Sequence, residues 1–186
     1  RTSVAAYHQY NYLLARENLT DHLNKKDKKN KIRQRLLKIR AKKVILATGA
    51  LERPLIFNNN DRPGIMLSSA IKKYSDYYGV ACGTKTIFFT NNDSSYESAL
   101  SLHNKGIKVE AIIDIRENSN AKIIKKINDA GIKIYWSYTI VDTNGYKRLS
   151  DVSIMKLSND GTSVTGSKIS IACDCLGIAG GWTPAV

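Results

Sequence analysis

One stretch, residues 44–54, constrains the possible fold more than any other part of the chain. Its sequence is Val-Ile-Leu-Ala-Thr-Gly-Ala-Leu-Glu-Arg-Pro. We expect a buried strand over residues 44–47 that ends at Thr48 and Gly49, because glycine permits a sharp turn and Pro54 cannot continue a strand ladder. Ligands bind at such carboxyl ends of strands in open α/β sheets. The stretch therefore predicts an α/β fold with a dinucleotide-type site at this strand end.

The composition is that of a globular protein, with 24% charged and 42% hydrophobic residues in a chain of 186. This length can bury one sizeable core or two small ones. No apolar run approaches the roughly 20 residues that a membrane-spanning helix needs, and residues 1–4 do not begin a signal peptide. The chain lacks an initial methionine and ends soon after a predicted strand. We therefore expect a fragment of a longer polypeptide.

The formal charge is +13, and the densest group of lysines lies in residues 25–31, while the other lysines are scattered along the chain. Nucleic-acid-binding surfaces combine such charge with aromatic side chains on which bases stack, and this stretch has none. We interpret it as a solvated loop and expect neither a nucleic-acid nor a membrane partner. Nucleic-acid binding through charge alone is a minor alternative.

The three cysteines, Cys82, Cys173 and Cys175, form no C-x-x-C pattern. The sequence therefore contains neither a dithiol redox centre nor a zinc pattern, and a reducing, cytoplasmic location fits. No base pairs with a nucleophile and no set of metal ligands is recognisable. We predict no catalytic residue and no metal site in this chain.

The hydrophobic pattern predicts two kinds of sheet. Residues 2–18 and 35–40 suggest short strands of an antiparallel β-meander. After a turn-rich boundary, strands and helices alternate, which indicates a parallel, Rossmann-like sheet. The expected strands are 85–90 and 109–114, and the expected helices are 68–78, 94–105 and 120–131, the second with a Ser94/Glu97 capping box. Residues 132–171 predict antiparallel hairpins, and residues 171–179 a last strand that ends at Gly180.

The loop after strand 85–90 lacks the glycines of a phosphate-binding loop. A dinucleotide site needs G-x-G-x-x-G, whereas Thr90, Asn92 and Ser95 occupy these positions. Asp114 lies near the place of a ribose-binding acid, but Arg116 could pair with it. We therefore expect a Rossmann-shaped unit that binds no dinucleotide at this loop. A ligand site made by the side chains of residues 91–93 is the alternative.

Three segments carry a family resemblance. Residues 47–66, 89–100 and 179–184 resemble, in the same order, the alpha subunits of the heterotetrameric sarcosine oxidases. The Ala-Thr-Gly of residues 47–49 resembles the ATG motif of the two-domain FAD/NAD(P)-binding oxidoreductases, to whose superfamily these subunits belong. Opine-oxidising and cyanide-forming amine dehydrogenase subunits are similar more loosely. A subunit of such an amine or opine dehydrogenase, or a non-catalytic Rossmann-like scaffold for assembly, is therefore an alternative.

The resemblance implies an activity and a set of partners. Sarcosine oxidases convert sarcosine to glycine and hydrogen peroxide with oxygen, and pass a one-carbon unit to tetrahydrofolate. The implied cofactor of the alpha subunit is NAD. FAD and FMN lie on, or are shared with, a partner subunit, and folate binds in a region outside this chain. The implied partners are the beta, gamma and delta subunits and a small-molecule amine.

The resemblance also implies domains and site residues. Residues 1–54 and 172–186 would be parts of a discontinuous first dinucleotide-binding domain. Residues 58–171 would be an inserted second Rossmann-like domain. The cofactor would be lined by one group of residues at the early strand end and one at the late strand end: Ala47, Thr48, Gly49 and Ala50, and Gly180 and Gly181. Thr48 could instead be a plain strand terminator, and we expect Trp182 to pack within its loop.

Overall fold

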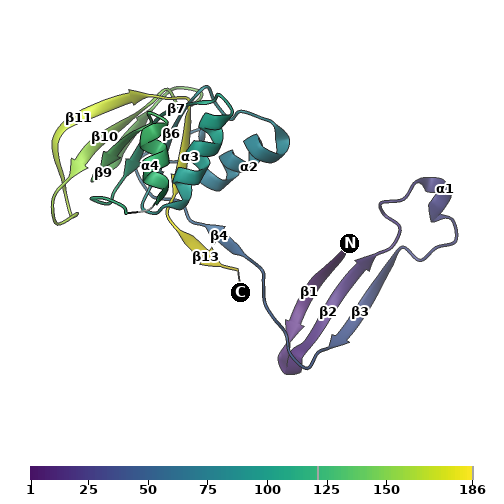
Figure 1. The fold of residues 1–186 in the computed structure, drawn as a ribbon. Coiled ribbons are helices and arrows are strands. Elements are labelled where there is room, and N and C mark those ends of the chain that lie inside the picture. The colour runs from purple at the N-terminus through teal and green to yellow at the C-terminus, as the bar shows by residue number, and fades with distance from the viewer. Residues whose placement is uncertain (121, 186) are drawn as a thin grey trace. The chain divides into compact units, whose positions relative to one another are not determined.

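The computed structural model describes residues 1–120 and 122–185 and divides into two compact units. Unit 1 comprises residues 1–48 and unit 2 residues 49–185. Figure 1 shows the helices and strands of both units, with most of them labelled. None of the helices in the described residues is long and apolar enough to cross a membrane.

Unit 1 is a three-stranded antiparallel meander. Its strands lie in the order β1-β2-β3, as predicted, and a short 3-10 turn, η1, joins the first two. The lysine-rich stretch lies in the connection between β2 and β3, where α1 makes a single exposed turn. The elements are β1 (Thr2–His8), η1 (Gln9–Asn11), β2 (Tyr12–Asn18), α1 (Lys25–Lys28) and β3 (Gln34–Arg40).

The buried strand predicted over residues 44–47 is not formed. These residues have no regular secondary structure, and Ile45 and Leu46 are 91% and 49% exposed. An apolar run becomes a buried strand only where neighbouring strands pair with its backbone and cover its faces. None of the strands that the structure describes pairs with these residues. The prediction of a strand at this place was wrong.

Unit 2 is built on a parallel five-stranded sheet. The strand order is β5-β12-β6-β7-β8, and each neighbouring pair is parallel. The predicted alternation of strands and helices is confirmed, as is the α/β, Rossmann-like class. The strands are β5 (Ile65–Leu67), β6 (Lys85–Thr90), β7 (Lys108–Asp114), β8 (Lys133–Trp136) and β12 (Cys175–Ala179). The helices are α2 (Ser68–Tyr78), α3 (Ser94–Asn104) and α4 (Lys122–Asp129).

Two smaller sheets complete unit 2. Antiparallel strands β9 (Tyr138–Asn144), β10 (Asp151–Leu157) and β11 (Val164–Ala172) form one of them, in the order β11-β10-β9. This agrees with the hairpins predicted over residues 132–171, except that β8 joins the parallel sheet. The other is a two-stranded ribbon of β4 (Ala50–Glu52) and β13 (Trp182–Pro184).

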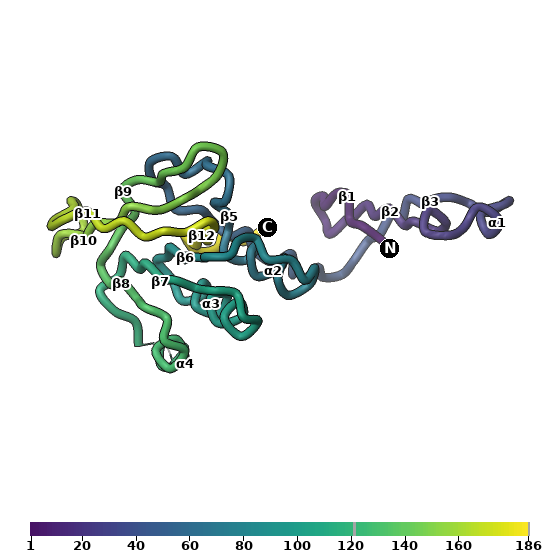
Figure 2. The backbone as a smooth tube through the Cα atoms, turned by 90° about the horizontal axis from the view of Figure 1, so that it is seen from above, coloured from purple at the N-terminus to yellow at the C-terminus, as the bar shows by residue number. Residues whose placement is uncertain are grey.

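The parallel sheet separates two hydrophobic cores. On β6, Phe88 packs with Ile71 of α2, Leu102 of α3 and other helical residues, because successive side chains of a strand point to opposite faces. Ile87, on the other face, packs with residues of β9 and β10. Figure 2 shows this layering, with α3 and α4 on one side of the sheet and β9 to β11 on the other. The result is a three-layer unit with the sheet in the middle.

The position of β12 differs from the expected division into domains. Residues 172–186 were assigned to the first domain together with residues 1–54, yet β12 pairs with β5 and β6 inside the parallel sheet. The strand therefore belongs to the sheet of unit 2. Strand order in a sheet depends on contacts between distant segments, so the local sequence of residues 171–179 could not indicate which sheet it joins.

A stability measurement can test this packing at Gly177, in the middle of β12. A Cβ atom there would lie 2.6 Å from two ring atoms of the buried Phe88 and 3.1 Å from Ile71. We expect Gly177→Ala to lower the free energy of unfolding by about 1–3 kcal/mol, the usual cost of overpacking a core. Urea unfolding measures this change. Val164→Ala, on the exposed strand β11, is the control and should change stability by less than about 0.5 kcal/mol. Equal effects of the two substitutions would contradict the packing.

Candidate functional site

The segments that follow Gly49 and Gly180 pair with each other in unit 2. The backbone N–H of Gly180 donates to the carbonyl of Arg53 at 2.7 Å, and the N–H of Arg53 donates to the carbonyl of Gly181 at 2.8 Å. The N–H of Ala185 donates to the carbonyl of Gly49 at 3.0 Å. The two segments therefore pair, but the register puts Gly49 beside Ala185 and Gly180 beside Arg53, at opposite ends of the ribbon.

Close approach of two backbones explains the glycine at position 180. A Cβ atom on Gly180 would lie 2.8 Å from the carbonyl oxygen of Pro54 and 2.9 Å from that of Arg53. Real Cβ atoms do not approach so closely, so only glycine fits. Gly49 and Gly181 have φ angles of +77° and +103°, which also favour glycine. The ribbon therefore accounts for all three glycines without a ligand.

The predicted cofactor-binding residues are divided by the boundary between the units. Ala47 and Thr48 end unit 1, whereas Gly49 and Ala50 begin unit 2. Ala50 lies on β4, opposite Pro184. Gly49 and Ala50 lie beside residues 184 and 185, whereas Gly180 and Gly181 lie beside Arg53. That the six residues line a cofactor stays a prediction.

Side chains fill the loop where a dinucleotide phosphate would bind. The Oδ1 atom of Asn92 accepts hydrogen bonds from the N–H of Ser94 at 3.0 Å and from its hydroxyl at 2.6 Å. The Asn92 amide donates to the carbonyl of Ala179 at 3.1 Å. Backbone N–H groups at a helix N-terminus are the usual anion donors of such a loop. The first of these on α3 already has a partner, which agrees with the predicted loss of the phosphate site.

The capping box predicted for α3 is wrong. Ser94 is the first residue of the helix and not the residue before it, and the structure places Asp93 at the N-cap without a side-chain hydrogen bond. Asn92 takes the capping role from one residue further upstream. The Ser-x-x-Glu pattern correctly signalled the start of a helix but not its capping residue, because the side chain of Asn92 accepts the N–H of Ser94 instead.

Asp114, at the end of β7, is fully saturated by protein partners. Its carboxylate is buried and accepts hydrogen bonds from the hydroxyl of Tyr96 at 2.7 Å and from the guanidinium of Arg116 at 2.7 and 3.0 Å. Arg116 also reaches Asp93 at 2.7 Å. Burial, together with the hydrogen bond to Asp114, raises the pKa of Tyr96. The hydrogen bond to Asp114 likewise raises the pKa of Arg116. The predicted pairing with Arg116 is confirmed, and a ribose would have to break it.

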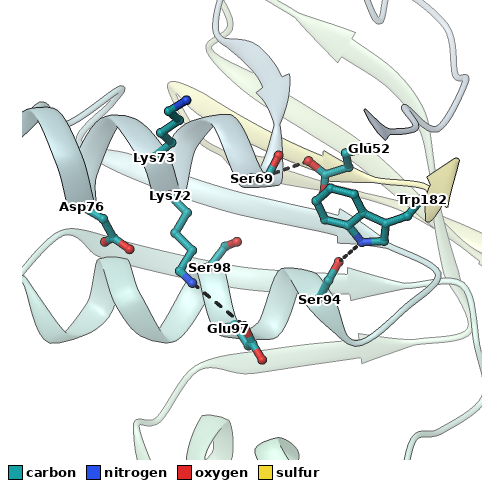
Figure 3. A pocket seen from close by; sticks show the side chains of 9 residues that line it. All are labelled: Glu52, Ser69, Lys72, Lys73, Asp76, Ser94, Glu97, Ser98 and Trp182. Carbon is teal, nitrogen blue, oxygen red and sulfur yellow. Dashed lines mark hydrogen bonds and ion pairs between the residues drawn. The ribbon is translucent and has the colours of Figure 1, made fainter. Parts of the chain in front are cut away.

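A cavity of about 250 Å³ lies between α2 and α3, beside the ribbon. Figure 3 shows the side chains that line it. Glu52 of β4 and Trp182 of β13 are direct register partners and form the wall nearest the ribbon. The other lining residues come from the two helices: Ser69, Lys72, Lys73 and Asp76 of α2, and Ser94, Glu97 and Ser98 of α3.

The polar side chains around the cavity differ in how closely hydrogen bonds and ion pairs hold them. The buried carboxylate of Glu52 accepts a hydrogen bond from the N–H of Ser69 at 2.8 Å, in the first turn of α2. The indole N–H of Trp182 points to the hydroxyl of Ser94 at 3.4 Å. Lys72 and Glu97 face each other with 3.9 Å between their charged atoms. Glu52 is therefore held by a short hydrogen bond, whereas Lys72 and Glu97 form a long ion pair.

Sequence reasoning missed Glu52 and the cavity around it. A single glutamate between Leu51 and Arg53 carries no periodic signal, and its partner Ser69 lies 17 residues away. Trp182 was expected to pack within its loop, but its side chain forms one wall of the cavity and is 47% exposed. Only the pairing of β4 with β13 brings these residues together.

Comparison with known proteins identifies relatives of the whole chain. The sarcosine oxidase alpha subunit of Corynebacterium sp. strain P-1 is 38% identical over 188 residues, and those of Corynebacterium sp. strain U-96 and Rhizobium meliloti are 34% and 33% identical over 186 residues. The chain resembles sarcosine oxidase alpha subunits throughout. The alignments include every residue of the chain, and the chain spans only 17–19% of the length of these relatives. The resemblance stated from the motifs is confirmed. No protein-family model matches the chain.

Solved structures show the same fold at lower identity. The chain matches L-proline dehydrogenase from P. horikoshii with a TM-score of 0.58 and 20% identity, over 98% of this chain and 28% of that one. It matches thioredoxin reductase from T. acidophilum with a TM-score of 0.55 and 18% identity, over 74% and 43%. The fold of the chain is therefore that of the FAD/NAD(P)-binding oxidoreductases, as predicted.

The network around Asp114 can be tested by removing its main partner. Arg116→Ala would leave a buried carboxylate without its counter-charge, and we expect a loss of about 3 kcal/mol in the free energy of unfolding. Adding Asp114→Asn should recover at least about 1 kcal/mol of this loss, because the unpaired charge is then gone. Urea unfolding of both variants gives the two values. An equal loss in the single and double variants would show that the charge pair is unimportant.

Proposed function

We propose that this chain is part of the alpha subunit of a sarcosine oxidase, an oxidoreductase that demethylates sarcosine to glycine with oxygen. The observation that carries the proposal is the 33–38% identity over every part of the chain to three proteins named sarcosine oxidase subunit alpha. The products would be hydrogen peroxide and a one-carbon unit passed to tetrahydrofolate. Beta, gamma and delta subunits would complete the enzyme in the cytoplasm.

Within this subunit, the two units would have different roles. The fold class supports a flavin or nicotinamide cofactor. We assign NAD to the alpha subunit, near the ribbon end at residues 47–50, and not to the loop after β6. The saturated contacts of Asn92 and Asp114 support this choice. FAD and FMN would lie on, or be shared with, the partner subunit, and unit 2 would contribute to subunit assembly.

A second candidate is a non-catalytic Rossmann-like scaffold that serves assembly only. It is favoured by the same filled loop, because a unit without a cofactor site can be retained for its surface alone. A third is a subunit of a related amine or opine dehydrogenase, which would have the same fold but another electron acceptor. The three candidates differ in what the assembled protein does to sarcosine.

The decisive experiment purifies the complete natural polypeptide together with its co-purifying partners and supplies sarcosine. We expect sarcosine-dependent hydrogen peroxide, measured with a peroxidase-coupled dye, and none with glycine, which has no methyl group to lose. Reduction of an artificial electron acceptor without peroxide would favour the dehydrogenase. Neither signal, in a preparation that contains flavin, would contradict an amine-oxidising role.

A single isosteric substitution tests where NAD binds. Asn92→Asp places a negative charge at the N-terminus of α3, where a pyrophosphate would lie if the loop after β6 held the dinucleotide. We expect the NAD affinity of the complete polypeptide, measured by calorimetry, to stay within about twofold, which corresponds to less than about 0.5 kcal/mol. Asn91→Asp, one residue earlier, is the matched control. A tenfold loss with Asn92→Asp but not with the control would relocate the site to this loop.

A further inference from the structure

Unit 1 carries most of the net charge of the chain. Residues 1–48 contain thirteen Lys and Arg side chains and three Asp and Glu side chains, a net charge of +10. The longer unit 2 contains sixteen basic and thirteen acidic side chains, a net charge of +3. A general bias toward lysine would charge the two units in proportion to their length. The charge of unit 1 is therefore a local feature.

The densest part of this charge lies in the connection between β2 and β3, where Figure 1 shows α1. We call its five lysines the lysine tip: Lys25, Lys26, Lys28, Lys29 and Lys31. Asp27 is the only acidic residue in residues 22–33, and all lysines of the tip except Lys28 are exposed. None of the ion pairs in the described residues involves a lysine of the tip.

Hydrogen bonds around Asp21 fix the base of the lysine tip. The carboxylate of Asp21 accepts hydrogen bonds from the side chains of Arg33 at 2.6 Å and Gln34 at 3.0 Å. The amide of Asn18 donates to the same carboxylate at 2.9 Å, and the ammonium of Lys28 donates to the backbone carbonyl of Asp21 at 3.2 Å. The four exposed lysines therefore extend from a connection that is already formed. Such preorganisation lowers the entropic cost of binding a partner.

The chemistry of the tip favours the carboxylates of a protein over the phosphates of a nucleic acid. Binding of single strands without sequence preference combines positive charge with aromatic rings on which bases stack, and no Phe, Tyr or Trp occurs between Tyr12 and Phe57. The nearby guanidinium groups, which could hold a phosphate through two parallel donors, are paired with Asp21 and Glu17. The tip thus offers single ammonium charges, which complement carboxylates spread over an acidic protein surface.

We propose that the lysine tip docks unit 1 onto an acidic surface of another subunit of the same enzyme. The ammonium groups of the four exposed lysines face Asp and Glu side chains of that subunit and guide its approach. The choice of partner rests on the proposed function, in which this chain is part of one subunit of a multi-subunit enzyme. Because exposed charges are screened by salt, the contact weakens as the ionic strength rises.

The test measures binding of the complete natural polypeptide to the remaining subunits of the enzyme, purified without it. In the tip variant, Gln replaces the four exposed lysines, and Lys28 is kept because it holds the base. At about 0.15 M ionic strength, we expect the Kd to rise at least about tenfold, which corresponds to about 1.4 kcal/mol. Most of this change should be a slower association, measured by surface plasmon resonance.

A matched control removes the same charge from unit 2. It replaces four exposed lysines that make no ion pair in the described residues by Gln: Lys122, Lys125, Lys126 and Lys147. We expect its Kd to stay within about twofold of the natural value. Circular dichroism verifies that both variants are folded. Equal binding by the tip variant and the control would overturn the docking surface.

Salt and other polyanions identify the class of partner, and the natural polypeptide alone suffices for this part. Raising the salt concentration to about 1 M, where the screening length is about 3 Å, should slow association at least about tenfold. An association rate that does not depend on salt would contradict an electrostatic contact. A DNA duplex and phosphatidylserine vesicles should bind more weakly than the subunits. Tighter binding to either, lost in the tip variant, would assign the tip to a nucleic acid or a membrane and overturn the proposal.

The docking surface and the proposed function can fail separately. If the assembled enzyme oxidises sarcosine and the tip variant assembles as well as the natural protein, the function stands and the docking surface is wrong. If the tip variant assembles poorly and the control assembles well, but the natural complex does not oxidise sarcosine, the docking surface stands and the oxidase assignment fails.

Discussion

The parallel pairing of β12 with β5 and β6 holds unit 2 together. β12 is formed late in the chain, yet it lies between two strands that come more than 80 residues earlier. The carboxylate of Asp174 fixes its start, since it accepts hydrogen bonds from the N–H groups of Thr84 and Lys85, both at 2.8 Å. The end of β12 leads directly into Gly180 and the ribbon. The cavity and the filled loop both depend on this one strand being in place.

Much of unit 2 could be predicted from local patterns. The helix over residues 68–78 ends at Gly79, which has a φ angle of +66°, and β6 and β7 lie where strands were predicted. Local sequence failed where a partner far along the chain decides the structure. Residues 44–47 have the composition of a buried strand but no strand beside them, and the sheet that contains β12 is set by β5 and β6.

The candidate sites show the same division between local and distant information. The missing glycines at Thr90 and Asn92 were visible in the sequence, and so was the nearness of Arg116 to Asp114. The cavity could not be predicted from the sequence, because Glu52 and Trp182 are 130 positions apart and become neighbours only when β4 pairs with β13. In the loop after β6, hydrogen-bonding groups that would serve a nucleotide are satisfied internally, so the fold persists without that ligand.

The hydrogen bond from the N–H of Ala185 to the carbonyl of Gly49 places the two chain segments side by side at the base of the ribbon. A domain whose two chain connections lie side by side can be inserted into another protein, because the connections of that protein need to span only a short distance. Its attachment needs only the two paired strands at its base.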